Sequence, residues 1–265
     1  MKNNKSMPVV ILCGGEGIRL AGEATYIPKG MVRVGHQPIL WHVMKRYALF
    51  GYTKFILALG RKGDMIRDYF LNYENYTNDI RIMLGERHAQ ALSTHQESGW
   101  EITMVDTGEN ANSGARIARC QQYIDAPQFM VTYSDSVGNI DFPKLLAFHK
   151  EKKKIGTVTG VIPPYREQEF HVAEGVAIGH FDVAHAKTSE RYINGGYMVF
   201  EKKIFSYLSS FNECRLENEV FKRLMEEREL AVYPHHGFWR WLDTDRDYRY
   251  FNTLVEENKT YWLKE

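Results

Sequence analysis

The amino-acid sequence predicts an α/β protein with a Rossmann-like, mostly parallel sheet that carries helices on both faces. One observation is the apolar run Val9–Cys13, which is rich in β-branched residues and ends at two glycines, as strands buried on both faces do. Another is that similar runs alternate with apolar residues at helical spacing, which indicates βαβ units. The length of 265 residues allows one or two domains, and we expect a single domain over residues 1–265.

The elements can be assigned in order along the chain. We expect strands over residues 9–13, 54–59, 102–105, 129–133, 157–162, 175–178 and 197–200. We expect helices over residues 39–50, 65–70, 117–123, 142–148, 220–227 and 248–257. The first helix follows Pro38, which a first helical turn tolerates. Residues 72–100 lack such a pattern and predict an excursion from the sheet, long enough to be functional or to contact another subunit.

Composition excludes several classes of protein. The chain has 34 lysines and arginines against 33 aspartates and glutamates, and the resulting charge of +1 argues against a duplex nucleic-acid binder. A hydrophobic share of 44% argues against disorder, and no apolar run is long enough to span a bilayer. The first apolar stretch lacks a signal-peptide cleavage site, so we interpret it as a strand. Three widely spaced cysteines indicate a reducing compartment, and we expect the cytoplasm.

A glycine-rich loop follows the first strand, at residues 14–20 with the sequence GGEGIRL. Ligands of open α/β sheets bind beyond the carboxyl ends of strands, and glycines let backbone N–H groups approach a phosphate. The loop is not a dinucleotide fingerprint, because Leu20 stands where the third glycine belongs, and it is not a P-loop, because Glu23 replaces the lysine. Arg19 and Lys29 add positive charge, so we predict a cradle for a nucleoside triphosphate.

This loop and its surroundings resemble the sugar-1-phosphate nucleotidyltransferases, and among them most closely the glucose-1-phosphate cytidylyltransferases. The pattern G-G-x-G-x-R-L is followed by the family's P-K pair, and the similarity continues to residue 42. Further matching segments lie, in the family's order, at residues 105–108, 133–135, 193–197 and 237–244. The resemblance implies the nucleotide-diphospho-sugar transferase fold. It also implies a nucleotide-binding half over about residues 1–160 and a sugar-phosphate-binding half over about residues 161–265.

The resemblance further implies an enzyme of nucleotide-sugar and polysaccharide biosynthesis that joins CTP to a sugar 1-phosphate, such as glucose 1-phosphate, and releases pyrophosphate. The residues that would neutralise charge during transfer are Arg19, Lys29 and Lys187. The nucleotide would be bound by Leu12, Gly14, Gly15, Gly17, Gly114, Arg116 and Asp135. The sugar phosphate would be bound by Lys187, Asn194 and Glu219.

Metal, assembly and partners are implied in the same way. One Mg²⁺ would be held by Asp135 and Asp243, which suits the preference of this ion for one or two carboxylates plus phosphate oxygens and water. Because the family forms homo-oligomers, we expect a homo-oligomer here. We expect neither a nucleic-acid nor a membrane partner.

Several positions depart from the family pattern and leave the substrate open. Serines replace the glycines around Asp135, and Ile18 replaces the loop's usual threonine. His171 stands where the family has a glycine, and the segment of Ala186 and Lys187 is shortened. The alternatives are another nucleoside triphosphate, an atypical phosphorylated substrate, or a nucleotide-binding homologue without turnover. A glycosyltransferase is disfavoured, because the sequence lacks a second aspartate two residues after Asp135.

Overall fold

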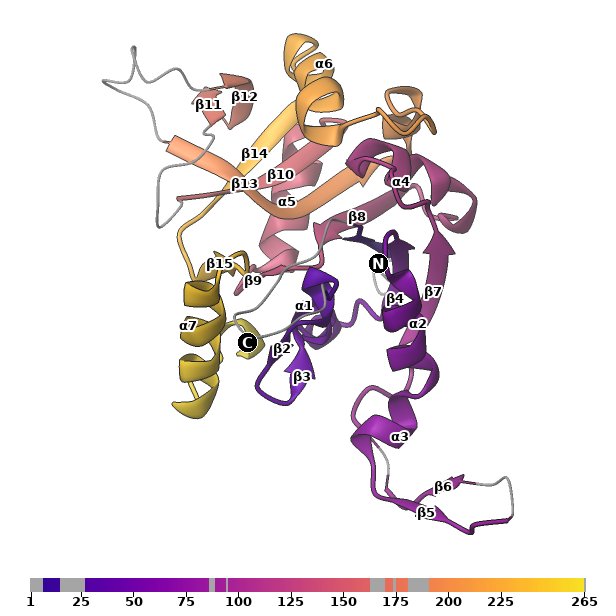
Figure 1. Ribbon diagram of the computed structural model, residues 1–265. Helices are drawn as coiled ribbons and strands as arrows, with labels where there is room; N and C mark the ends of the chain where they lie inside the picture. Colours follow the sequence, from indigo (N-terminus) through magenta and orange to yellow (C-terminus); the bar gives the residue numbers. More distant parts are fainter. Residues whose placement is uncertain are drawn as a thin grey trace.

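The computed structural model describes residues 7–14, 27–85, 89–93, 95–162, 170–173, 175–180 and 191–264. Within these residues one sheet has the strand order β10-β14-β12-β11-β13-β8-β1-β4-β7, and β10 also pairs with β13. Helices pack against both faces of this sheet (Figure 1). The α/β class and the Rossmann-like architecture predicted from the sequence are confirmed.

One half of the sheet is entirely parallel. Its neighbouring strands are β8 (Gln128–Tyr133), β1 (Val9–Cys13), β4 (Lys54–Leu59) and β7 (Glu101–Asp106). Val9 of β1 lies opposite both Phe55 of β4 and Met130 of β8. Because these strands run in one direction, their carboxyl ends meet at the same edge of the sheet, where open α/β sheets bind ligands.

The other half of the sheet is mostly antiparallel. Its strands are β10 (Gly156–Val161), β11 (Phe170–Ala173), β12 (Val176–His180), β13 (Arg191–Glu201) and β14 (Leu230–His235). Strand β13 joins the halves, because it pairs with β8 on one side and with β10 and β11 on the other. The sequence predicts only residues 197–200 of this strand, which begins before the N-G-G run at residues 194–196. In the structure these residues form an irregularity within the strand, where Gly196 has a φ of +80°.

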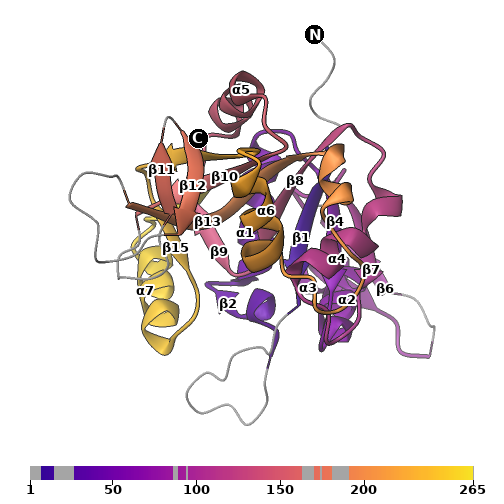
Figure 2. The ribbon, with the colours of Figure 1, turned by 90° about the horizontal axis from the view of Figure 1, so that it is seen from above.

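Alternating side chains of β1 divide the core into two layers. Val9, Ile11 and Cys13 belong to one layer, which contains side chains of α1 (Ile39–Leu49), α2 (Gly63–Leu71), α5 (Phe142–Lys152) and α7 (Asp245–Glu256). Val10 and Leu12 belong to the other layer, which contains side chains of α4 (Ser113–Arg119) and α6 (Phe221–Glu226). Helices α4 and α6 face the viewer in Figure 2. The continuous apolar run of β1 is therefore explained by burial on both faces.

Shorter elements connect these layers. The 3-10 helices are η2 (Lys29–Met31), η3 (Gln121–Tyr123), η5 (Lys202–Ser206) and η7 (Tyr261–Leu263), and η6 (Leu216–Val220) is a π-helix that runs into α6. Two small ribbons pair β2 (Arg33–Val34) with β3 (Gln37–Pro38), and β9 (Ser136–Gly138) with β15 (Trp239–Trp241). The β9–β15 ribbon brings together two parts of the chain that lie about a hundred residues apart.

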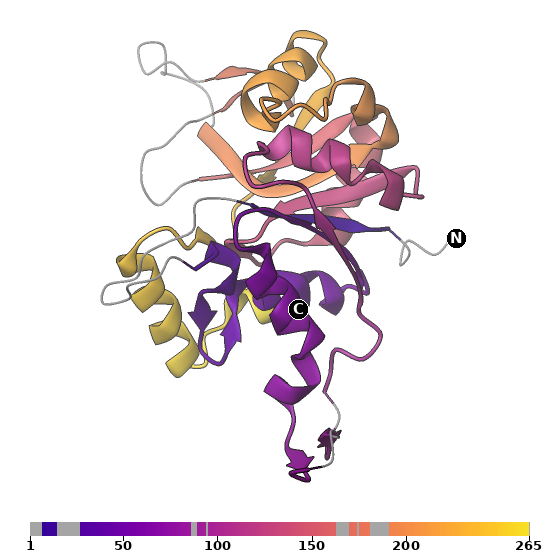
Figure 3. The same cartoon turned by 45° about the vertical axis from the view of Figure 1, so that its right-hand side comes forward.

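The excursion predicted over residues 72–100 is present. It contains α3 (Tyr73–Thr77) and a hairpin of β5 (Ile80–Ile82) and β6 (Ala89–Ala91), and it projects away from the sheet (Figures 1 and 3). We call residues 72–93 the arm. No helix in the described part of the chain is both long and apolar enough to cross a lipid bilayer.

His42 is a buried histidine on α1 that forms hydrogen bonds through both ring nitrogens. Its ring is 2.9 Å from the carbonyl oxygen of Val34 through Nε2 and 3.2 Å from the indole nitrogen of Trp262 through Nδ1. Because an indole N–H only donates, Nδ1 accepts and Nε2 carries the proton. Burial lowers the pKa of His42 to about 4, and the bond to Val34 only partly opposes this effect. The fold therefore requires the neutral ring.

We predict that acid destabilises the protein through His42. In the unfolded chain this histidine titrates near its ordinary pKa of about 6.5, so the unfolded state binds more protons between pH 6.5 and pH 4. The stability present above pH 6.5 is lost as the pH falls, and the loss at pH 5 is about 2 kcal/mol. Urea unfolding at pH 7 and pH 5 measures it.

The control is His42→Gln, which can accept from Trp262 and donate to Val34 but does not titrate. Its loss of unfolding free energy between the two pH values should be smaller than that of the wild type by about the same 2 kcal/mol. An equal loss in both proteins would contradict the assignment to His42.

Candidate active site

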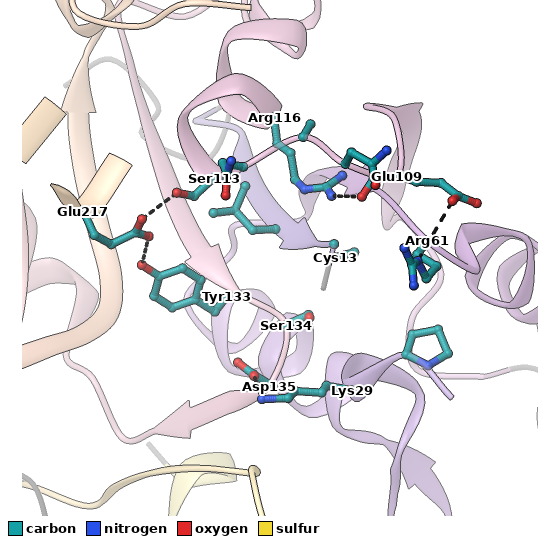
Figure 4. Close-up of a pocket in the computed structure, with 16 residues that line it drawn as sticks. Cys13, Lys29, Arg61, Glu109, Ser113, Arg116, Tyr133, Ser134, Asp135 and Glu217 are labelled. Atoms are coloured by element: carbon teal, nitrogen blue, oxygen red, sulfur yellow. Dashed lines mark hydrogen bonds and ion pairs between the residues drawn. The ribbon is translucent and has the colours of Figure 1, made fainter. Parts of the chain in front are cut away.

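A pocket of about 480 Å³ lies beside the carboxyl ends of the parallel strands (Figure 4). Its wall is built from the ends of β1 and β8, from η2 and the start of α4, and from the loops after β4 and β7. The residues that line it are Leu12, Cys13, Gly14, Pro28, Lys29, Arg61, Glu109, Asn110, Ala111, Asn112, Ser113, Arg116, Tyr133, Ser134, Asp135 and Glu217. The pocket therefore occupies the place where the fold class predicts a ligand.

Lys29, Asp135 and Asp243 meet at one end of this pocket. Lys29 begins η2, Asp135 follows β8, and Asp243 follows β15. The ammonium of Lys29 lies 3.6 Å from Oδ2 of Asp135 and donates a hydrogen bond to Oδ1 of Asp243. The backbone N–H of Leu242 donates to the carbonyl oxygen of Asp135 at 2.8 Å, which extends the β9–β15 ribbon to the two aspartates. Three residues that the sequence places in one site are thus brought together.

Burial and neighbouring charges shift the pKa values of Lys29 and Asp135. Burial lowers the pKa of Lys29, but the charges of Asp135 and Asp243 outweigh it and raise the pKa above its usual value. The pKa of Asp135 is raised, because burial and the nearby charge of Asp243 outweigh the attraction of Lys29. One ammonium therefore does not offset burial and the second carboxylate together. Because two carboxylates and one ammonium leave a net charge of −1, additional positive charge would be favourable there.

Arg116 is a buried cation at the other end of the pocket. Its side chain is 4% exposed, and its guanidinium donates mainly to the backbone. Nη1 lies 3.0 Å from the carbonyl oxygen of Leu59, 2.9 Å from that of Gly108 and 2.7 Å from Oγ1 of Thr107. Nη2 lies 3.1 Å from the carbonyl oxygen of Glu109. Burial lowers the pKa of Arg116, but a guanidinium remains charged, so these oxygens stabilise a positive charge inside the protein.

Glycines make room for this guanidinium. A Cβ atom at Gly14 would lie 2.0 Å from Cζ of Arg116, and one at Gly60 would lie 2.6 Å from Nη1. Arg116 thus packs against the backbone just beyond β1 and β4 and bonds to the segment after β7. The requirement for glycine at position 14 follows from this contact, in addition to any approach of a ligand.

A hydrogen-bond network lines the wall between these two ends. The carboxylate of Glu217 accepts from Ser113 Oγ at 2.6 Å and from the phenol of Tyr133. Asn194 of β13 donates to the same phenol oxygen at 3.2 Å, and its Oδ1 accepts from the backbone N–H of Gly196 at 2.9 Å. Burial and the charge of Glu217 raise the pKa of Tyr133 well above its usual value, so the phenol stays protonated and donates. The network joins α4, β8, β13 and η6.

The structure distributes the predicted residues in three groups. Those that line the pocket are Leu12, Gly14, Lys29, Arg116 and Asp135. Asp243 and Asn194 lie next to it, because they bond to the lining residues Lys29 and Tyr133. Outside the described residues lie Gly15, Gly17, Arg19, Ala186 and Lys187, as does the side chain of His171, whose backbone belongs to β11.

Two predicted residues take other positions. Gly114 is not among the residues lining the pocket; a Cβ there would lie 2.6 Å from Sγ of Cys214, so close packing explains this glycine. Glu219 is exposed, and the carboxylate that lines the pocket is that of Glu217. The sequence offers no signal for Glu217, because it lies in a π-helix that no periodicity predicts and its partners come from distant elements. The roles of Gly114 and Glu219 stay predictions.

Comparison with known proteins identifies the family of this chain. The profile of the nucleotidyl transferase family matches residues 8–253. The chain belongs to the nucleotidyl transferase family. It is 36% identical over 256 residues to a Bacillus subtilis protein described as a probable glucose-1-phosphate cytidylyltransferase, covering 97% of this chain and 99% of that one.

A second relative and a solved structure are also similar to this chain. The glucose-1-phosphate cytidylyltransferase of Salmonella typhimurium is 34% identical over 257 residues, covering 97% of this nucleotidyl transferase and 98% of the Salmonella protein. Among solved structures, the inositol-1-phosphate CTP transferase from T. maritima superposes with a TM-score of 0.66 at 16% identity, covering 94% of this chain and 96% of that one. At that identity the likeness shows the fold alone.

Proposed function

We propose that this nucleotidyl transferase joins CTP to a sugar 1-phosphate and produces a CDP-sugar and pyrophosphate. The observation that carries the proposal is the convergence of Lys29, Asp135 and Asp243 at a pocket beside the carboxyl ends of the strands. The relatives at 34–36% identity, which are described as glucose-1-phosphate cytidylyltransferases, support both substrates. The sugar itself is open, with glucose 1-phosphate the first candidate. A CDP-sugar as product would place the enzyme in nucleotide-sugar and polysaccharide biosynthesis.

The proposed reaction needs no protein nucleophile. An oxygen of the sugar phosphate attacks the α-phosphorus of CTP, a new P–O bond forms, and the bond to the β-phosphate oxygen breaks, so that pyrophosphate leaves with the electron pair. The protein would position the two phosphates and neutralise their charge. Lys29 would hold a phosphate oxygen as a point charge. Arg19 and Lys187, which we propose as its partners, lie outside the described residues.

Asp135 and Asp243 are the residues that would hold a divalent metal ion, for which we propose Mg²⁺. Their carboxylates converge on one ammonium, so this point already favours positive charge. Within the described residues no group of three or more His, Cys, Asp or Glu side chains could hold a metal. Two carboxylates suit Mg²⁺, which takes its other ligands from phosphate oxygens and water. When bound, such an ion polarises the phosphoryl oxygens and offsets their charge.

Binding of the nucleotide would use the remaining wall of the pocket. We propose that Leu12, Gly14 and Arg116 contact it, together with Gly15, Gly17 and Gly114. The chain would function as one domain, in which residues of the second half, such as Asn194, Glu219 and Lys187, receive the sugar phosphate. The three cysteines are free and buried, which supports a reducing compartment such as the cytoplasm.

A pyrophosphate-release assay tests the function. CTP, UTP, GTP and dTTP are each combined with a panel of sugar 1-phosphates that includes glucose 1-phosphate. We expect release with CTP and with at least one sugar 1-phosphate. Release only with another nucleotide would overturn the assignment of the base. Binding of CTP by calorimetry without release from any pair would instead indicate a nucleotide-binding homologue without turnover.

We predict that Asp135→Ala lowers turnover at least about 100-fold, which corresponds to about 2.7 kcal/mol in the barrier. The reason is that the variant removes one of the two carboxylates proposed to hold the metal. Folding should suffer little, because the raised pKa of Asp135 shows that its charged form is disfavoured in the fold. Steady-state kinetics and a thermal melt measure both effects.

The matched control is Asp125→Ala, since Asp125 is an exposed aspartate whose partner is Lys54 at 3.5 Å. It should keep wild-type turnover. Turnover of Asp135→Ala within tenfold of the wild type would contradict the metal assignment.

We further propose that the arm joins copies of this chain into a homo-oligomer. Its apolar side chains are unusually exposed: Leu84 by 96%, Ile82 by 55%, Met83 by 54% and Leu92 by 50%. Contiguous exposed apolar surface of this kind marks interaction sites. Strands β5 and β6 pair with each other as a separate two-stranded sheet, so their outer edges are also available. A second copy supplies the same apolar arm, which makes a symmetric contact self-complementary.

We predict that the double variant Ile82→Lys and Leu84→Lys shifts the protein from an oligomer to a monomer in light scattering coupled to size-exclusion chromatography. Two charges in an apolar contact would be buried without partners. Phe211→Lys is the control, because Phe211 is 76% exposed but lies outside the arm. A monomeric wild type at micromolar concentration would contradict the proposal.

A further inference from the structure

Asp247 is a buried carboxylate that lies four residues after Asp243. It belongs to the first turn of α7 and is 5% exposed. The side chain of Asp243, in contrast, is 52% exposed. Because so much of Asp243 is open to solvent, packing does little to hold its carboxylate beside Asp135. Apart from the bond to Lys29, its position depends on its backbone.

Asp247 binds the backbone at Asp243 and Thr244. Its Oδ2 accepts from the backbone N–H groups of these residues at 3.4 and 3.1 Å, and from Oγ1 of Thr244 at 2.8 Å. In return, the backbone N–H of Asp247 donates to Oγ1 of Thr244 at 3.2 Å, which completes a capping box at the start of α7. One carboxylate oxygen thus fixes both the start of the helix and the residue before it.

Arg240 holds the other oxygen of the same carboxylate. Oδ1 of Asp247 accepts from Nε of Arg240 at 3.1 Å and from Nη2 at 3.0 Å. Both side chains are largely buried, at 13% and 8% exposed, and the guanidinium also lies 4.3 Å from the centre of the Tyr250 ring. Arg240 belongs to β15, where it lies opposite Val137 of β9. The pair therefore ties α7 to the ribbon that follows Asp135.

These contacts fix three successive backbone N–H groups around Asp243. The N–H of Leu242 is bound by the carbonyl of Asp135, and those of Asp243 and Thr244 are bound by Asp247. An ordinary capping box needs only the threonine and the acidic residue three positions later. Here the acidic residue also reaches Asp243 and is held by an arginine from another element, which capping alone does not require.

We propose that Asp247, held by Arg240, is the positioning residue that sets the carboxylate of Asp243 beside Asp135 and Lys29. The proposal rests on the function above, in which Asp135 and Asp243 bind the metal that accompanies CTP. Removing a residue that hydrogen-bonds to a metal ligand, without contacting the metal itself, typically lowers metal affinity or activity 10–100-fold.

The experiment measures metal binding without turnover. Mn²⁺ replaces Mg²⁺ as the probe, and its binding to the full-length protein is followed by electron paramagnetic resonance with saturating CTP and no sugar phosphate. We expect Asp247→Ala to raise the Mn²⁺ concentration for half-saturation at least about tenfold. Arg240→Lys keeps a positive charge but loses the two-pronged contact, and should give a smaller rise in the same direction. If Asp247→Ala does not fold, the Mn²⁺ titration of Arg240→Lys still tests the proposal.

Asp141→Ala is the matched control, because Asp141 caps α5 by accepting from the backbone N–H of Lys144 at 3.0 Å. It should lower thermal stability as Asp247→Ala does but leave the Mn²⁺ titration unchanged. Thr244→Ser keeps the hydroxyl and should bind Mn²⁺ like the wild type. An unchanged titration in both Asp247→Ala and Arg240→Lys would overturn the proposal, and so would a wild type that binds no Mn²⁺. A wild type that binds Mn²⁺ but releases no pyrophosphate would refute the proposed function, while the titration would still decide the role of Asp247.

Discussion

The contact of Lys29 with both Asp135 and Asp243 is the interaction on which the candidate active site depends. Two carboxylates that share one site repel each other, and the pKa of Asp135 is raised for this reason as well as by burial. The protein holds them together with covalent geometry and backbone bonds: Asp135 follows a buried strand, and the β9–β15 ribbon brings Asp243 to it. The ammonium attracts Asp135 more strongly than Asp243 repels it, but this attraction does not outweigh burial as well. Such a point attracts further positive charge, which is the physical reason for proposing a metal ion at the same residues.

A second cation, Arg116, has a different physical role in the same pocket. Lys29 faces carboxylates and is about a third exposed. Arg116, in contrast, is buried and bonds to carbonyl oxygens at the last residue of β4 and in the loop that follows β7. Burying a guanidinium is costly unless hydrogen bonds compensate its charge, and the four bonds from Nη1 and Nη2 provide this compensation. Through these bonds Arg116 joins the end of β4 to the loop after β7, which forms part of one wall of the pocket. The charge is thus structural first, and any contact with a nucleotide would use a side chain already fixed in place.

The sequence predicts the fold well where the burial of an element is visible in its own pattern of apolar residues. Buried strands such as β1 and β4 coincide with their apolar runs, because both faces are covered. The prediction is weaker where contacts with distant chain segments determine whether residues form a strand. Strand β13 is longer than its apolar run, and β14 contains Pro234 and pairs with strands distant in the sequence. The site follows the same rule. Lys29, Asp135 and Asp243 are predicted through sequence motifs. Glu217 is recognisable only in the structure, because its hydrogen-bond partners are distant in the sequence. Asp247 is recognisable only there as well, because a single aspartate near a helix start does not reveal its bonds to Arg240 and to the backbone of Asp243.

The charges that line the pocket nearly cancel among the described residues. Lys29, Arg61 and Arg116 carry three positive charges, and Glu109, Asp135 and Glu217 carry three negative ones, so 3 − 3 leaves no net charge. Asp243, at the edge, adds one negative charge. A nucleoside triphosphate brings about four more. Electrostatic attraction of a triphosphate would therefore depend on cations beyond these residues. This is the physical reason for proposing a divalent metal at the two aspartates and for proposing Arg19 and Lys187 as further cations. The net charge of +1 for the whole chain does not reveal this local need for additional positive charge.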